Sequence, residues 1–200
     1  MQANPDNEPA GDFAKEVIGA MMDAGEVDFV DHLYDYDFHA ETTEVLVFEE
    51  GYRNQMKNAE KAIFDNLSRF QQLDYLHSAF LAKTYSEQYY DASTLYNGKG
   101  DAYRHTLWNA FGAAKLGETL MKQLTNAHEV PDPGEINNPL EKIMDLHNNQ
   151  VGRNIGSQST FMFMMKVKFA VNNGETDYIH PRALGGEVIP GVSQIIPTNQ

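Results

Sequence analysis

The stretch DAYRHTLWNAFGAAKLGETLMKQLTN, residues 101–126, decides the fold that we expect for this chain. Alanine, leucine, lysine and glutamate are common in it and no proline interrupts it, which favours a helix throughout. The composition therefore predicts one long helix from Asp101 toward Asn126. Residues 130–139 (VPDPGEINNP) are rich in proline and asparagine, and we expect them to form a loop.

A second helix is predicted to follow this loop. Asn138 suits the N-cap position, Pro139 suits the first helical position, and Glu141 completes a capping box. The apolar spacing continues to residues 155–156, where we expect the helix to end.

The flanking segments complete a mainly helical domain. Apolar residues have helical spacing from 52 to 90, which predicts two or three helices with breaks near Asn66 and Thr84. Residues 157–171 form another helix or a strand, because the run MFMMKVKF allows either, and the NNG that follows should stop it. We expect a mainly α, compact helical domain with an acidic N-terminal extension and an irregular, extended C-terminal tail, 175–200.

The negative charge of the chain is concentrated near its beginning. The net charge is −14, yet residues 1–50 contain 14 acidic residues and Lys15 as their one base, while residues 51–200 are almost neutral. The chain therefore divides into an acidic, partly extended segment, 1–50, and a helical domain, 51–200. Neither part has the basic surface of a nucleic-acid-binding protein, which argues against DNA or RNA as a partner.

Composition also narrows the choice of cofactor and compartment. The chain has no cysteine, which excludes disulfides and thiolate-bound metals and leaves His, Asp, Glu, Asn and backbone oxygens as ligands. It has no run of about 18 apolar residues, so no transmembrane segment is expected. The opening MQANPDNEPAGDF has neither the basic start nor the apolar block of a signal peptide.

A stripe of polar and small residues follows one side of the first predicted helix. At about 100° per residue, Asp101, His105, Trp108, Asn109 and Gly112 fall within roughly a quarter of its circumference. An aspartate and a histidine one turn apart can share a metal ion or a hydrogen bond. The alternative is that Asp101 is an N-cap and His105 is a buried histidine with satisfied hydrogen bonds.

The second predicted helix carries a matching polar face. Asp145 and Asn149 share this face, with Asn148 and Gly152 beside them, and we expect it to oppose the polar stripe of the first helix. His147 points about 200° away from Asp145, into an apolar stripe, so a regular helix prevents both from binding one ion. The spacing predicts that His147 is a buried anchor.

His128 and Glu129 stand together where the first predicted helix ends. Side chains at such ends often converge on clefts, and histidine with glutamate is a common pairing of ligand and base. The sequence contains no HExxH motif, which argues against a zincin-type metalloprotease.

Three segments together resemble an uncharacterised bacterial domain family: NGKGDAYRHTLWNA at 97–110, NAHE at 126–129 and MDLHNNQVGR at 144–153. The resemblance covers roughly residues 95–155, with a weaker similarity in the tail at 193–200. It implies a secreted or cell-surface bacterial domain, of the kind found in lipoproteins, surface proteins and the ends of toxin-like polypeptides. The residues at motif positions are Asp101, Arg104, His105, His128, Glu129, Asp145, His147, Asn148, Asn149, Gly152 and Arg153.

The leading functional hypothesis is a metal-assisted hydrolase of the bacterial envelope or secreted space. His105 and His128, with Asp101, Glu129 or Asp145, would hold one divalent ion, which we expect to be zinc. The ion would lower the pKa of a bound water, and a remaining carboxylate would act as base. An arginine of the motifs would bind an anionic group of the substrate. The candidate catalytic residues are Arg104, His105, His128, Glu129, Asp145, His147, Asn148, Asn149 and Arg153.

Two alternatives stay open. In the first, the domain is a binding or interaction module without catalysis, and the same polar groups form a buried hydrogen-bond network that joins two helices. In the second, a histidine–aspartate pair performs acid–base catalysis without a metal, as in a toxin-type enzyme. The substrate or protein partner is not identified by the sequence.

Overall fold

The computed structural model describes residues 38–135, 138–158 and 162–200. The expected mainly α fold is confirmed, and a small antiparallel sheet accompanies the helices. Most of the predicted acidic segment lies outside the described residues, so its boundary at residue 50 stays a prediction. The elements are η1 Phe38–Ala40, α3 Thr43–Arg53, α4 Asn58–Phe64, α5 Arg69–Tyr89, η2 Ala92–Thr94, α6 Lys99–Leu116, α7 Glu118–His128, α8 Pro139–Gln158, α9 Phe163–Asn173, β1 Asp177–His180 and β2 Gln194–Pro197.

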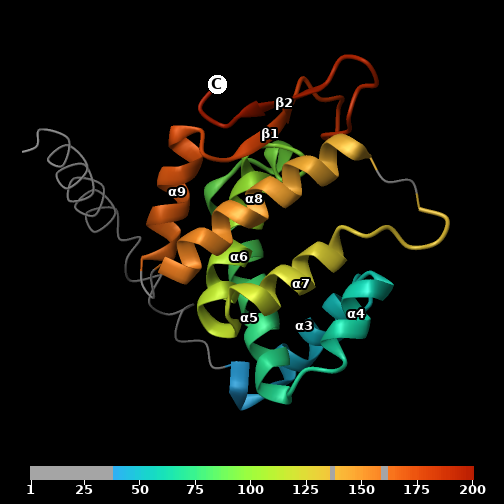
Figure 1. Cartoon of the computed structure of the whole chain (residues 1–200), viewed down its shortest axis with the longest axis vertical. Helices are drawn as coiled ribbons and strands as arrows, with labels where there is room; N and C mark the ends of the chain where they lie inside the picture. The colour runs from blue at the N-terminus through green and yellow to red at the C-terminus, as the bar shows by residue number, and fades with distance from the viewer. Residues whose placement is uncertain (1–37, 136–137, 159–161) are drawn as a thin grey trace, which may run out of the picture. The chain divides into compact units, whose positions relative to one another are not determined.

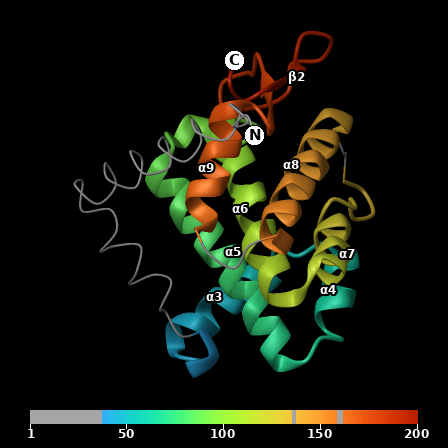
Figure 2. The same ribbon diagram turned by 60° about the vertical axis from the view of Figure 1, so that its left-hand side comes forward.

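Helix α6 is the central element of this structure. It packs against α5, α7, α8 and α9, as Figures 1 and 2 show from two directions. Ala102, Leu107 and Phe111 are among its buried apolar residues, and its polar residues are buried with them. Because an enclosed helix leaves its polar side chains little water, these side chains must find partners on neighbouring helices.

The prediction of one helix from Asp101 to Asn126 is wrong at Gly117. This glycine has φ 84° and ψ 150°, and it ends α6 and begins α7. L-residues with a side chain rarely adopt such a conformation, so glycine makes the sharp corner possible. The corner folds α7 back against α6 and brings His128, at the end of α7, to the level of His105.

Helices α6 and α8 form the most extensive helix pair of the fold. Gly152 of α8 lies against α6 so closely that a Cβ atom would clash with the carbonyl oxygen of Thr106 and lie 2.7 Å from Cβ of Asn109. Gly156, one turn later, has the same relation to the carbonyl of Ala110. The two glycines therefore let the polar faces of α6 and α8 meet directly, as the matching polar faces predicted.

The break expected near Asn66 is confirmed, whereas the one expected near Thr84 is wrong. Helix α5 begins with a capping box formed by Ser68 and Gln71 and continues through Thr84 to Tyr89. Leu81 and Tyr85, on either side of Thr84, are buried in the core. Packing against α6 thus outweighs the weak helix propensity of threonine.

The C-terminal part follows the predicted order of helices, but the tail that was expected to be irregular contains two strands. Helix α8 starts at Pro139, with the side chain of Asn138 accepting from the amide of Leu140, and it runs two residues past the predicted end. The run at 157–171 contributes helix α9, which stops at Gly174. Strands β1 and β2 then pair antiparallel, with Tyr178 opposite Ile196.

Among the described residues, no helix combines the length and apolar character that a bilayer crossing requires.

Candidate metal centre

Three side chains with metal-binding atoms meet where α6 and α8 are in contact. Among the described residues, Asp101, His105 and Asp145 each place a ligand atom within 4.8 Å of the other two. Nε2 of His105 lies 3.6 Å from Oδ1 of Asp101 and 3.4 Å from Oδ1 of Asp145. The cluster lines a cavity of about 450 Å³, which we call the cluster cavity. One nitrogen and two carboxylates from two rigid helices therefore face a common space.

The hydrogen bonds of His105 fix its tautomer. Nδ1 lies 3.2 Å from Oδ1 of Asn149, and Nε2 lies 3.0 Å from Nη2 of Arg104. Because a guanidinium has donors alone, Nε2 must be the acceptor, and Nδ1–H then donates to Asn149. Burial, followed by the charge of Arg104, lowers the pKa of His105 from 6.5 to about 3. The imidazole is thus neutral, with its Nε2 lone pair directed at the cluster.

The two aspartates have opposite electrostatic surroundings. Burial works to raise the pKa of Asp101, but the charge of Arg104 and the backbone amide of Asn97 outweigh it and lower that pKa. Burial raises the pKa of Asp145 well above its usual value, and the charge of Asp101 adds to this effect. Oδ1 of Asp145 is buried and has no hydrogen-bond partner within the described structure. The negative charge of Asp145 is therefore not compensated by its surroundings, and a bound cation or a proton would stabilise this buried carboxylate.

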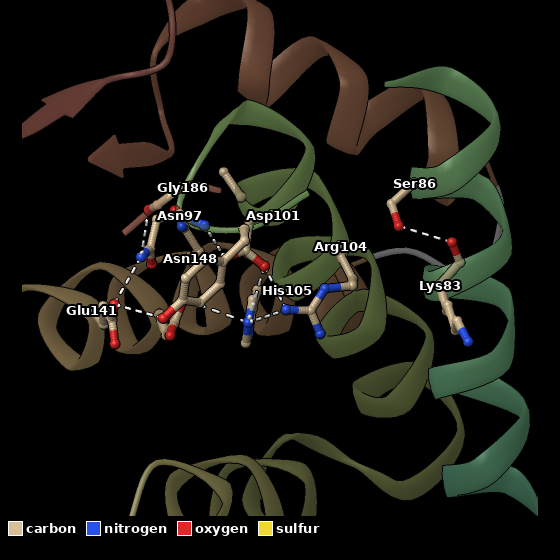
Figure 3. Close-up of polar contacts among 12 residues, drawn as sticks. Lys83, Ser86, Asn97, Asp101, Arg104, His105, Glu141, Asn148 and Gly186 are labelled. Carbon is tan, nitrogen blue, oxygen red and sulfur yellow. Dashed lines mark hydrogen bonds and ion pairs between the residues drawn. The ribbon is translucent and has the colours of Figure 1, made fainter. Parts of the chain in front are cut away.

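Arg104 lies beside the cluster and partly open to solvent, with 34% of its side chain exposed. Nη2 donates to Oδ1 of Asp101 and contacts His105, as Figure 3 shows, where the guanidinium points toward both residues. Its other neighbours include a second cavity of about 580 Å³, which we call the aromatic cavity because Phe48, Tyr52 and Trp108 line it. Arg104 and His128 line both cavities.

A buried hydrogen-bond network, on the side of His105 away from the two aspartates, orients this histidine. Oδ1 of Asn149 accepts from Nδ2 of Asn109 at 2.6 Å as well as from His105. Oδ1 of Asn109 accepts in turn from Thr125 at 3.1 Å and from Arg153 at 3.0 Å. These groups come from α6, α7 and α8, so the orientation of His105 depends on three helices at once.

His128 and Glu129 line the cluster cavity but lie outside the group of three ligand atoms. Nδ1 of His128 is 2.7 Å from Oε2 of Glu60, and the ring centroids of His128 and His105 are 6.5 Å apart. Glu129 accepts weakly from Nδ2 of Asn149 at 3.5 Å, and burial raises its pKa. The structure therefore brings both residues to the site without placing them beside Asp101 and Asp145.

The remaining predicted residues lie away from the cavity. His147 is exposed and contacts the carbonyl of Glu175 and the side chain of Asp177, so the expectation of a buried anchor is wrong. The reason is that β1 starts beside this face of α8 and leaves the imidazole at its edge. Asn148 bonds the backbone of Asp177 in both directions and ties β1 to α8. Arg153 is buried in the supporting network and does not line either cavity.

The sequence reasoning missed Glu60. This glutamate is fully buried, and it accepts from Tyr75 at 2.8 Å and from Tyr52 at 3.4 Å, besides contacting His128. One signal was present, because Glu60 occupies the apolar side of its helix, three and four residues before Ile63 and Phe64. A carboxylate at such a position needs polar partners in the core.

The donor set suits a divalent ion. Imidazole nitrogen and carboxylate oxygen are ligands that zinc and other first-row divalent ions accept. Three protein ligands facing a cavity leave a coordination position free for water or substrate, as in catalytic rather than structural sites. The Nδ1–H of His105 donates to an amide oxygen, which is the type of support that orients metal-bound histidines.

Fold and site together describe a helical domain built around a buried Asp-His-Asp cluster. A family model described as a domain of unknown function, DUF6973, matches residues 66–174. The match covers more than half of the chain, and the chain belongs to this family. It includes the cluster and its supporting network, while Glu60 lies just before it. No curated protein and no solved structure matches the chain.

Proposed function

We propose that this domain is a metal-dependent hydrolase in which Asp101, His105 and Asp145 hold one divalent ion. The observation that carries the proposal is the pair of atoms formed by Nε2 of His105 and Oδ1 of Asp145, 3.4 Å apart. The lone pair of Nε2 accepts from Arg104, and Oδ1 is buried without a hydrogen-bond partner among the described residues. Two such electron-rich atoms repel one another unless a proton or a cation lies between them.

The bound ion would supply a nucleophile at neutral pH. A divalent ion lowers the pKa of a bound water to about 7, and zinc is the ion that we would test first. The cluster cavity has room for a substrate beside this water. An ester or an amide is the substrate class that such a hydroxide attacks. A secreted or cell-surface setting, with a substrate from the bacterial envelope, is the biological context that we propose from the resemblance of the motifs.

Arg104 supports a second candidate function. Its guanidinium bonds Asp101 and contacts His105, so it already supplies one positive charge to the cluster. In this reading the cluster and the network behind it are a structural core for a binding module, and no ion is needed. The hydrolase function requires that Arg104 moves aside when the ion enters, because its guanidinium occupies the lone pair of His105. Its side chain is partly exposed, which permits this movement.

Metal analysis separates the two functions. The full chain is purified without a histidine tag, dialysed against zinc and analysed by mass spectrometry, alongside His105→Ala, Arg104→Met and His147→Ala. We expect one zinc per wild-type chain, none in His105→Ala, and retention in His147→Ala, whose histidine lies outside the cavity. Arg104→Met should bind zinc more tightly, because a competing cation is gone. A wild-type chain that takes up no zinc, with Arg104→Met strongly destabilised, would support the structural network instead.

A further inference from the structure

The Glu60–His128 pair joins two helices that are far apart in sequence. Helix α4 carries Glu60 and helix α7 ends with His128, and these helices pack side by side in Figure 1. Oε2 of Glu60 lies 2.7 Å from Nδ1 of His128, while Oε1 accepts from the hydroxyls of Tyr75 and Tyr52. Burial raises the pKa of both tyrosines well above the usual value, so both hydroxyls keep their protons and donate. The carboxylate of Glu60 is thus held in one orientation.

This arrangement selects one tautomer of His128. We infer from this geometry that Oε2 of Glu60 accepts and that the shared proton belongs to Nδ1 of the imidazole. Nε2, on the other side of the ring, then carries the lone pair. A carboxylate behind a histidine also stabilises the imidazolium that forms when Nε2 takes up a proton. Glu60 therefore prepares Nε2 of His128 to accept and return a proton.

The place of His128 suits this role. Its side chain is 27% exposed, whereas that of His105 is 4% exposed, so ligands can reach His128 more easily than His105. It lines both the cluster cavity and the aromatic cavity. The ring of Trp108 packs edge-on against it with a centroid separation of 5.1 Å, which fixes the plane of the imidazole. A substrate lying in both cavities would pass this histidine beside the Asp-His-Asp cluster.

We propose that His128 is the proton-transfer residue of the reaction and that Glu60 is its positioning residue; this inference rests on the proposed hydrolase function. A water molecule in the cluster cavity gives one proton to Nε2 of His128, and its oxygen forms a bond to the carbonyl carbon of an ester. The bond from that carbon to the leaving oxygen breaks, and its electron pair stays on the leaving oxygen. This oxygen takes the proton from His128, so ester and water become acid and alcohol.

Two esters with different leaving groups test the role of His128. The zinc-loaded full chain is assayed with p-nitrophenyl acetate and phenyl acetate, alongside His128→Gln and the exposed control His147→Gln. His128→Gln should lower kcat/KM for phenyl acetate by about a hundredfold. The loss should be smaller for p-nitrophenyl acetate, because its leaving group needs no proton. Zinc affinity should stay unchanged, since His128 is not a ligand, and His147→Gln should behave as wild type.

The outcomes separate this inference from the function on which it rests. A wild-type protein that hydrolyses p-nitrophenyl acetate no faster than free zinc overturns the hydrolase proposal and this inference with it. Equal losses with both esters in His128→Gln, or no loss, overturn the inference and leave the hydrolase standing. Complete loss of the bound zinc in His128→Gln also overturns it, because the histidine would then be a ligand.

Nitrogen NMR of the imidazoles tests the role of Glu60 without any substrate. Wild-type protein should show His128 with its proton on Nδ1, and Glu60→Gln should show a mixture of tautomers, because an amide can either donate or accept. His147, which contacts a backbone carbonyl, should keep its spectrum in both proteins. A wild-type His128 with its proton on Nε2 would overturn the inference. Because His128 itself reports the result in the wild type, the test holds even where Glu60→Gln folds poorly.

Discussion

Oδ1 of Asn149 lies 3.2 Å from Nδ1 of His105 and accepts a hydrogen bond from it across the contact between α6 and α8. The same oxygen accepts from Nδ2 of Asn109 at 2.6 Å, and the amide nitrogen of Asn149 donates to Glu129. One buried amide therefore fixes the orientation of the imidazole and with it the direction of the Nε2 lone pair, which accepts from Arg104. The Asp-His-Asp cluster depends on a residue that does not line its cavity.

Asn149→Ala should weaken both the fold and the metal site. The change leaves the donors of His105 and Asn109 buried without their acceptor, which costs about 1–3 kcal/mol. Metal affinity should fall by roughly 10- to 100-fold, as when the group that orients a metal-bound histidine is removed. Urea unfolding and a zinc competition assay measure the two effects. Asn154→Ala, an exposed position on the same helix, is the control and should change neither quantity. Unaltered zinc affinity in Asn149→Ala would show that Asn149 does not orient the ligand.

Asp145→Asn should make the metal-free protein more stable and abolish metal binding. Burial opposes the charged form of Asp145, and its Oδ1 has no partner among the described residues, so a neutral amide of the same shape is easier to bury. We expect a gain of about 1 kcal/mol, measured by thermal unfolding. Asp65→Asn removes an exposed partner of Arg53 and serves as the control, with a change of less than about 0.5 kcal/mol. A loss of stability in Asp145→Asn would contradict this account of the carboxylate.

Gly152→Ala should separate α6 from α8. A Cβ atom there would meet the backbone of Thr106 and lie 2.7 Å from Cβ of Asn109, neither of which moves freely. We expect a loss of about 1–3 kcal/mol in the free energy of unfolding, together with weaker zinc binding. Gly51→Ala, in α3, has no described atom within 4 Å of the new Cβ and should gain about 0.5–1 kcal/mol. Equal stability of the two variants would refute the close helix contact.

The stability of the metal-free protein should depend on pH through His105. Its pKa falls from 6.5 in the unfolded chain to about 3 in the folded one, so between these values the unfolded chain binds one more proton. The free energy of unfolding should therefore decrease as the pH is lowered, with a slope approaching about 1.4 kcal/mol per pH unit. Urea unfolding at several pH values measures the slope, and His105→Gln should flatten it.

The raised pKa of Asp145 acts in the opposite sense, because it adds stability that is lost as the pH rises. The two slopes are therefore compared in proteins that carry Asp145→Asn, one with His105 and one with His105→Gln, so that Asp145 no longer contributes. The same slope in both proteins would show that His105 takes up its proton equally well in the folded chain.

Local rules were sufficient for much of the helical structure. The start of α8 at Pro139 follows from the chemistry of an asparagine cap and a first-turn proline, both of which act within a few residues. The end of α9 at Gly174 follows in the same way. Thr84 shows where such rules fail, because the continuity of α5 depends on packing against α6, a helix that is distant in sequence. Tertiary contacts of this kind leave no local signal.

In the site, too, the relations within one helix could be predicted from the sequence, whereas the contacts between distant helices could not. Helical spacing placed Asp101 and His105 on one face and Asp145 on the opposing face, because a fixed rotation per residue relates positions within a helix. The position of His128 depended on the corner at Gly117, which composition did not indicate. The partner of His128 comes from α4, so no spacing rule relates Glu60 to it.

The corner at Gly117 has a consequence for the comparison of this domain with its relatives. A single residue joins α6 to α7, and its backbone conformation suits glycine. A relative that keeps both imidazoles but has lost this glycine must connect the two helices by another path. A glycine at position 117, which an alignment alone can reveal, therefore marks the family members in which His105 and His128 lie together as they do here.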